Sequence, residues 1–118
     1  MICTAVVLVR LRSPREIDPV SGIWTGDWGP TPSHRNAVII AFRLDGTRLT
    51  GAVNPGPHAL QFTKGTFEVQ SGVVHFEVEV LAAAREVRYV IDGKVEGRTL
   101  LGTWYNADNK GNFRLIRK

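Results

Sequence analysis

The stretch V-V-H-F-E-V-E-V-L, residues 73–81, alternates apolar and polar side chains through most of its length. Successive side chains of a β-strand point to opposite faces, so the even-numbered valines share one face with Phe76 and the polar residues share the other. These polar residues are His75, Glu77 and Glu79. One apolar and one polar face is typical of a strand in an antiparallel sheet that is buried on one side. The stretch therefore predicts an antiparallel strand.

The same pattern recurs in short segments from Ser21 onward. Glycine-containing turns separate these segments about every eight to twelve residues, which is typical of an antiparallel sandwich or barrel. No long segment carries apolar side chains at helical spacing. We expect an all-β fold of eight or nine strands. The predicted turns are Asp45-Gly46, Lys64-Gly65, Ser71-Gly72 and Asp92-Gly93, with longer loops at 29–35 and 54–58.

Composition and charge limit the classes of protein to which this chain can belong. The 118 residues fit one domain, and 43% hydrophobic with 22% charged residues indicate a folded rather than a disordered chain. The net charge of +4 is spread along the sequence without a run of Lys or Arg, so we predict no nucleic-acid partner. Cys3 is the only cysteine, which excludes an intramolecular disulfide and a four-cysteine zinc site.

Residues 1–18 differ from the rest and are expected to form a leader before a barrel domain at 19–118. The apolar run at 5–9 is too short to span a bilayer, and the leader lacks a basic n-region and a clear small-residue cleavage site. Three alternatives stay open for it: the tail of a signal peptide, an additional strand, or a disordered segment. A cytoplasmic and an exported location stay open with them.

Several motifs in this chain resemble those of a known group of barrels. Gly22-Ile23-Trp24 matches the G-x-W motif that opens the first strand of calycins, the group that includes lipocalins and avidins. The hairpin sequences at 44–53 and 92–104, followed by an aromatic strand at 112–117, are similar to the small calycin-like domains of many bacterial proteins. The resemblance covers roughly residues 20–118 and implies a small antiparallel up-and-down β-barrel of about eight strands.

The resemblance also implies a particular contact at one end of the barrel. Lipocalins usually place an arginine from the last strand over the opening tryptophan, which is Trp24 here. Arg114 and Arg117 are the two candidates in the last predicted strand. Trp24 is therefore expected to close one end of the barrel.

An eight-stranded barrel is just wide enough to be filled by side chains or to hold one small ligand. Strand alternation sends a set of large aromatic side chains inward, and these are the candidate ligand-binding residues: Trp24, Trp28, Phe42, Phe76, Tyr89 and Trp104. Of the two tryptophans in the first strand, Trp28 lies further towards the expected mouth and is favoured for ligand contact. The loops at 29–32 and 54–57 would shape that mouth if they lie at the same end.

These residues indicate a non-enzymatic barrel that binds a small apolar or aromatic ligand or a protein partner. Two alternatives remain: an enzyme of the barrel cyclase or isomerase kind, and a structural accessory domain whose interior is simply filled. An enzyme would need an ionisable side chain inside the barrel, and the charged residues fall mostly on the predicted outer faces. We predict no catalytic residue and no cofactor.

Two groups of polar residues are candidates for other chemistry. His75, Glu77 and Glu79 share a face, but a metal site would need ligands from another strand as well, so a solvated outer face is favoured. Asp27, His34 and Arg35 lie near the first predicted loop and match no catalytic spacing. We predict neither a metal site nor a membrane span.

Overall fold

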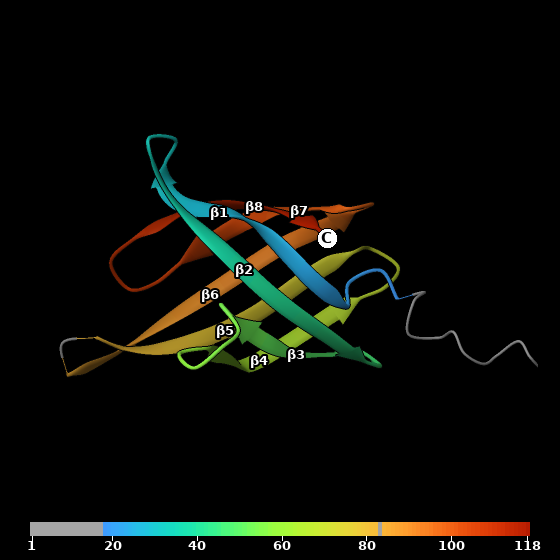
Figure 1. Cartoon of the computed structure of the whole chain (residues 1–118), viewed down its shortest axis with the longest axis horizontal. Coiled ribbons are helices and arrows are strands. Elements are labelled where there is room, and N and C mark those ends of the chain that lie inside the picture. The colour runs from blue at the N-terminus through green and yellow to red at the C-terminus, as the bar shows by residue number, and fades with distance from the viewer. Residues whose placement is uncertain (1–17, 83) are drawn as a thin grey trace, which may run out of the picture.

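The computed structural model describes residues 18–82 and 84–118, so the expectations for residues 1–17 of the leader lie outside the described part. Over the described residues the chain is all-β, with eight antiparallel strands closed into a barrel and no helix (Figure 1). The predicted fold class is confirmed. The strands are β1 (Gly22–Thr31), β2 (His34–Asp45), β3 (Arg48–Val53), β4 (Leu60–Glu68), β5 (Val73–Ala82), β6 (Arg85–Glu96), β7 (Thr99–Tyr105) and β8 (Lys110–Arg117).

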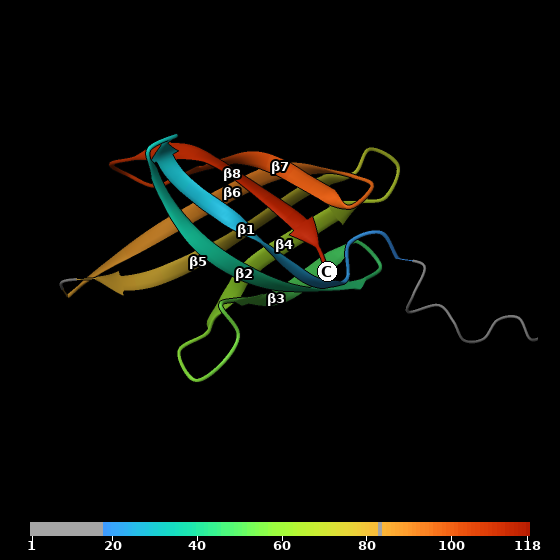
Figure 2. The same ribbon diagram turned by 45° about the horizontal axis from the view of Figure 1, so that its top comes forward.

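The strands follow one another around the barrel in chain order, each antiparallel to the one before (Figure 2). β8 then pairs with β1, with Leu115 opposite Gly26, and this pairing closes the sheet. A closed barrel leaves no unpaired strand edge. Within the described ranges we find no helix that could cross a bilayer.

Alternation along the strands fills the interior with apolar side chains. Trp24, Gly26 and Trp28 lie on the inward face of β1, as predicted: Trp24 is fully buried, and Trp28 packs against the core. No polar or charged residue within 18–82 and 84–118 belongs to the buried set. The charged side chains therefore lie on the outside, where water solvates them.

Two of the predicted turns are wrong. Asp92-Gly93 lies inside β6, and Lys64-Gly65 lies inside β4. At Gly93 the missing side chain makes room for a neighbour, because a Cβ there would lie 2.9 Å from Cζ of Phe113. Gly65 likewise allows the backbone of Leu49 to approach. Glycine inside a strand marks a close approach of this kind, and its sequence signature resembles that of a turn.

The predicted loop at 29–35 is also wrong. β1 continues through Pro30 to Thr31 and β2 begins at His34, so only residues 32–33 connect them. The pairing of β1 with β2 becomes irregular between Trp28 and Thr31, which accommodates a proline that cannot donate a ladder hydrogen bond. The hairpin after Asp45 is confirmed, with Gly46 at a φ of +68°.

The closed end of the barrel is built around Trp24. Its indole Nε1 donates a hydrogen bond to the carbonyl oxygen of Val20 at 2.8 Å. The guanidinium of Arg117 lies 6.0 Å from the centroid of the Trp24 ring and donates to the carbonyl oxygens of Asp18, at 3.0 Å, and of Ser21. Arg117 rather than Arg114 thus fills the place that the resemblance to lipocalins implies.

Candidate ligand cavity

A cavity of about 190 Å³ lies inside the barrel. It is nearer to the end opposite Trp24, and we call that end of the barrel the mouth. The mouth is formed by the β1–β2 hairpin and the connections β3–β4, β5–β6 and β7–β8, so the two proline-containing segments do lie at the same end. Ten of the fourteen lining residues carry only hydrocarbon side chains. These ten are Val38, Ile40, Val53, Leu60, Phe76, Val78, Val80, Ile91, Phe113 and Leu115.

Three aromatic side chains, Trp28, Tyr89 and Trp104, form what we call the mouth cluster. The Trp28 and Trp104 ring centroids are 5.0 Å apart with the rings nearly perpendicular, and Trp28 and Tyr89 make a similar contact at 6.2 Å. Edge-to-face geometry is the favoured arrangement for aromatic pairs. The cluster joins β1, β6 and β7, which fixes the aromatic wall of the cavity.

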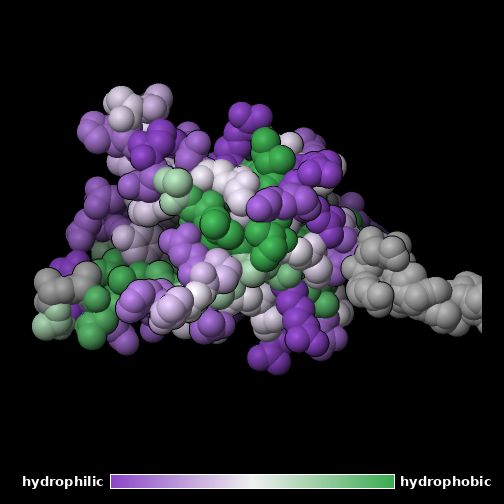
Figure 3. Space-filling view, viewed as in Figure 1, coloured by the Kyte–Doolittle hydropathy of each residue, from purple (hydrophilic) through white to green (hydrophobic). Residues whose placement is uncertain are grey.

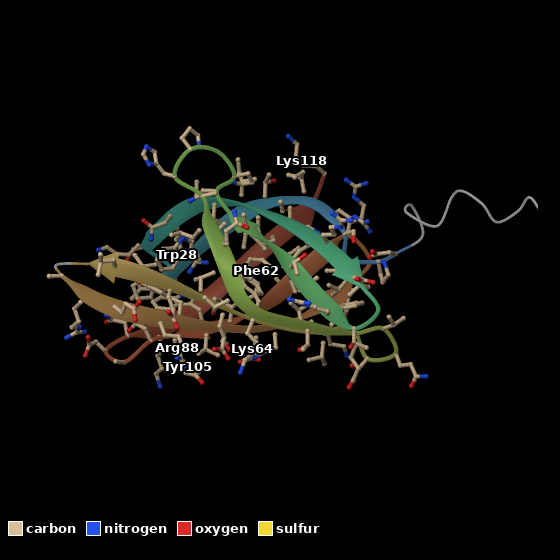
Figure 4. The ribbon with its side chains drawn as sticks, turned by 90° about the horizontal axis from the view of Figure 1, so that it is seen from below. Trp28, Phe62, Lys64, Arg88, Tyr105 and Lys118 are labelled. Atoms are coloured by element: carbon tan, nitrogen blue, oxygen red, sulfur yellow. The ribbon has the colours of Figure 1, made fainter. Side chains whose placement is uncertain are left out.

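A second aromatic group separates the cavity from the closed end. Phe42 contacts Phe76 at a centroid distance of 5.5 Å, Phe62 stacks on Phe76 at 4.4 Å, and Trp24 meets Phe42 at 6.3 Å. Figure 4 shows Phe62 and Trp28 inside the barrel, whereas Lys64, Arg88 and Tyr105 lie along its outer side. The packed phenylalanines form the floor of the cavity.

The structure brings four of the six sequence-predicted residues together around this cavity: Trp28, Phe76, Tyr89 and Trp104. The other two do not line the cavity: Phe42 is buried within the floor, and Trp24 is buried beyond it at the closed end. The predicted set lacked the other ten of the fourteen lining residues, among them Leu60 and Phe113, whereas Asn54 belongs to the loop that was expected to shape the mouth. Strand alternation carries a signal for Phe113, but the position of Leu60 depends on the path of the β3–β4 loop.

Asn54 begins that loop and holds it against β2. Its backbone N–H donates to the carbonyl oxygen of Ile39 at 2.6 Å, and its side-chain Oδ1 accepts from the Ile39 N–H at 3.0 Å. Asn54 has a φ of +51°, a conformation that asparagine tolerates better than most residues. These two hydrogen bonds with Ile39 fix one side of the mouth.

The cavity wall contains no carboxylate, imidazole, amine, guanidinium or thiol among its lining residues. Four lining side chains carry a polar atom: Trp28, Asn54, Tyr89 and Trp104. The indole Nε1 of Trp104 is buried and has no hydrogen-bond partner in the described structure. The site can therefore bind by shape, apolar contact and a few neutral polar groups, as most small-molecule sites do.

His75 lies on the outer face of β5, where the sequence placed it, but with a partner from β6 that the sequence did not reveal. Its Nδ1 lies 2.6 Å from Oδ1 of Asp92, and its Nε2 lies 2.9 Å from Oε2 of Glu77. Partial burial lowers the pKa of His75, but the two hydrogen bonds outweigh it, so the pKa lies above its ordinary value of 6.5. The hydrogen bond with His75 lowers the pKa of Glu77 below its ordinary value of 4.5. No group of three residues suited to a metal ion occurs in the described ranges.

Asp27 and Arg35 form an ion pair on the outside of the barrel, with Arg35 Nη2 2.7 Å from Asp27 Oδ1. Arg35 also donates to Oδ1 of Asn112 at 2.8 Å, so it ties together β1, β2 and β8. His34 instead shares a hydrogen bond with Thr31 in the hairpin. None of these groups lines the cavity, and their contacts account for them as structural residues.

Comparison of the chain with models of protein families, with curated proteins and with solved structures found no match. The geometry of the barrel itself therefore carries the functional argument.

Proposed function

We propose that this protein binds a small, mainly apolar ligand inside the barrel and does not transform it. The observation that carries the proposal is the cavity of about 190 Å³ with its hydrocarbon wall and aromatic mouth cluster. Protein interiors are close-packed and hold few voids larger than a water molecule. An apolar void somewhat smaller than this one, of about 150 Å³, accepts benzene in an engineered protein. The dimensions suit a ligand of one or two rings.

We further propose that the barrel is calycin-like. Three features support this assignment: the G-x-W opening of β1, the eight strands paired in chain order, and the stacking of Arg117 from the last strand on Trp24. Eight-stranded barrels of this kind, including lipocalins, are wide enough to hold one small ligand. The closed end would then be the base of a cup, and the mouth its ligand entrance.

The composition of the wall favours binding over catalysis. A cyclase or isomerase that assists its substrate by proton transfer needs a positioned acid or base in the cavity. Tyr89 is the one titratable side chain among the lining residues, and its half-buried ring packs against Trp28. A filled accessory domain fits less well, because the interior is not filled.

A protein partner is a second candidate, supported by the outer surface. Ile23, Ile39 and Ile116 are each about two-fifths exposed on the neighbouring strands β1, β2 and β8. Figure 3 shows an apolar patch over β1 and β2 on the face turned to the viewer. Contiguous exposed apolar surface often marks a site of association. This patch lies outside the barrel, so the two functions are separable by mutation.

The cavity proposal is tested with a substitution that fills the void. Val80→Phe places a larger side chain in the cavity wall of β5, and Val73→Phe makes the same change on the exposed face of that strand. Toluene, naphthalene and acetophenone are titrated into each protein and followed by shifts of its NMR signals. We expect wild type and Val73→Phe to bind at least one compound and Val80→Phe to bind it at least about tenfold more weakly, the effect of losing about 1.4 kcal/mol. Wild type that binds none of the three, or Val80→Phe that binds like wild type, would overturn the proposal.

A further inference from the structure

The indole N–H of Trp104 is the unusual polar group of this barrel. Trp104 is 6% exposed, and its Nε1 is buried without a hydrogen-bond partner in the described structure. Trp24, buried to a similar extent, bonds its own Nε1 to Val20 at 2.8 Å. Nearly all buried donors in native proteins are bonded, and leaving one unbonded is unfavourable. Because Trp104 is a lining residue of the cavity, its unbonded N–H points to a partner from outside the described residues.

Among the described residues, no acceptor forms a hydrogen bond with the Trp104 N–H. Trp104 lies in β7 between β6 and β8, opposite Ile91 and Gly111, where the backbone groups pair in the ladder. Its closest ring neighbour, Trp28, stands nearly perpendicular at 5.0 Å. An aromatic face is at best a weak acceptor compared with an oxygen or nitrogen lone pair. No bond of the fold has to break for this N–H to bind a ligand, but because the nitrogen is buried, the Trp104 ring has to turn slightly towards the cavity.

Water alone satisfies this donor poorly. A buried water usually needs about three hydrogen bonds, including acceptors for its own hydrogens. Among the remaining lining residues, Trp28 is a donor only, so Asn54 and the Tyr89 hydroxyl are the side-chain acceptors for such a water, and the Oδ1 of Asn54 already accepts from Ile39. Most of the wall is hydrocarbon. A ligand that presents one acceptor and is otherwise apolar matches the wall better than water does.

The charge of the ligand follows from the same wall. A charged group moved into an apolar cavity without a counter-charge is strongly disfavoured. The lining residues contain no acidic or basic side chain, so neither a carboxylate nor an ammonium group would find one. The acceptor should therefore be neutral, such as a ketone, ester, ether or ring nitrogen.

We propose that the cavity takes an uncharged aromatic compound of one or two rings, with its hydrogen-bond acceptor bound to the indole N–H of Trp104. This inference rests on the proposed function and adds the chemistry of the ligand. It assigns different roles to the two mouth tryptophans, because Trp104 supplies the hydrogen bond and Trp28 supplies apolar contact.

The test uses two probes of matched shape, acetophenone and α-methylstyrene, in which a carbonyl oxygen is replaced by a methylene group. Each is titrated into wild type, Trp104→Phe and Trp28→Phe, and indole N–H signals are followed in nitrogen-labelled protein. In wild type, we expect acetophenone to move the Trp104 N–H proton downfield and α-methylstyrene to leave it without that downfield shift. The bonded N–H of Trp24 serves as an internal control. Trp104→Phe should lower the affinity for acetophenone relative to α-methylstyrene by about three- to tenfold, the usual effect of one hydrogen bond.

Trp28→Phe should weaken both probes and leave their relative affinity unchanged. If both probes bind wild type and Trp104→Phe leaves the relative affinity unchanged, the acceptor assignment is overturned while cavity binding stands. If neither probe binds wild type, the cavity proposal fails and this inference fails with it. Should Trp104→Phe not fold, the wild-type signal decides: equal movement of the Trp104 N–H with both probes rejects the hydrogen bond.

Discussion

The closed end and the mouth of this barrel use tryptophans from the same face of β1 in opposite ways. At the closed end Trp24 is fully buried, its N–H bonds to Val20, and Arg117 covers its ring. At the mouth Trp28 is half-buried beside the cavity and touches Trp104, whose N–H has no partner in the described structure. The closed end is completed by groups of the chain itself, which bond the Trp24 N–H, whereas the Trp104 N–H at the mouth has no such bond among the described residues.

This difference shows how one simple barrel combines stability with an open interior. The closed end joins residues from both ends of the barrel sequence, since Arg117 binds the carbonyl oxygens of Asp18 and Ser21. The phenylalanine floor continues that packing to the middle of the barrel. Residues beyond the floor contribute less packing to one another and more surface to the cavity. Stability and binding are therefore expected to respond to different substitutions.

The largest expected difference is between Trp24→Ala and Trp28→Ala. Removing the fully buried ring of Trp24 should lower the free energy of unfolding by about 3–5 kcal/mol, because it leaves a new void in a packed end. Trp28 already borders a void and is only partly buried, so its removal should cost roughly half as much. Urea unfolding followed by circular dichroism measures both. If Trp24→Ala does not fold, Trp24→Phe and Trp28→Phe should give the same ranking with smaller losses. An equal loss of unfolding free energy at the two positions would contradict the comparison.

A smaller difference is expected between the two arginines of β8. Arg117→Met keeps the aliphatic stem but removes the charge over Trp24 and the hydrogen bonds to the 18–21 segment. Charge-assisted hydrogen bonds typically contribute about 1.5–3 kcal/mol, so a loss near 2 kcal/mol is expected. Arg114→Met is the matched control, because Arg114 is exposed on the outer face and its replacement should change stability by less than about 0.5 kcal/mol. Loss of stability in Arg114→Met of the same size as in Arg117→Met would contradict the assignment of Arg117 to the closed end.

The two ends also differ in how far the sequence predicts them. Alternation in β1 and β5 correctly places Trp24, Trp28 and Phe76 inside, because burial on one face of a strand leaves a period of two in the sequence. The choice of Arg117 over Arg114 depends on the pairing of Arg117 with Trp24 across β8 and β1, which the sequence does not specify. The cavity depends on the volume left by side chains from all around the barrel. Whether the Trp104 N–H finds a hydrogen-bond acceptor depends on the side chains that the neighbouring strands place around it.

The misplaced turns have a related cause. Asp45-Gly46 and Asp92-Gly93 are the same dipeptide, yet the first enters a hairpin and the second lies inside β6. At Gly46 the glycine supplies a positive φ and faces open space, whereas Gly93 lies beneath the ring of Phe113. The deciding contact comes from a residue twenty positions further along the chain. Local turn chemistry cannot distinguish the two cases.

The smallest expected effect concerns the outer face, and it separates the barrel wall from its interior. The folded pKa of His75 is raised, so its stabilising contribution is fully present below its ordinary pKa of 6.5 and is lost as the pH rises through the folded pKa. Glu77 has a lowered pKa, so its contribution is present above 4.5 and is lost as the pH falls through the folded pKa. The His75 interactions should therefore stabilise the fold most between these two values.

His75→Gln should lower the free energy of unfolding by up to about 1 kcal/mol near pH 5.5 and by much less near pH 9, since partly exposed pairs contribute little. His58→Gln, in the exposed β3–β4 loop, is the matched control and should have no effect at either pH. The affinity of acetophenone should stay constant over the same range, because no carboxylate, imidazole or amine lines the cavity. A ligand affinity that follows the titration of His75 would show that the wall and the interior are coupled, against the separation that the structure supports.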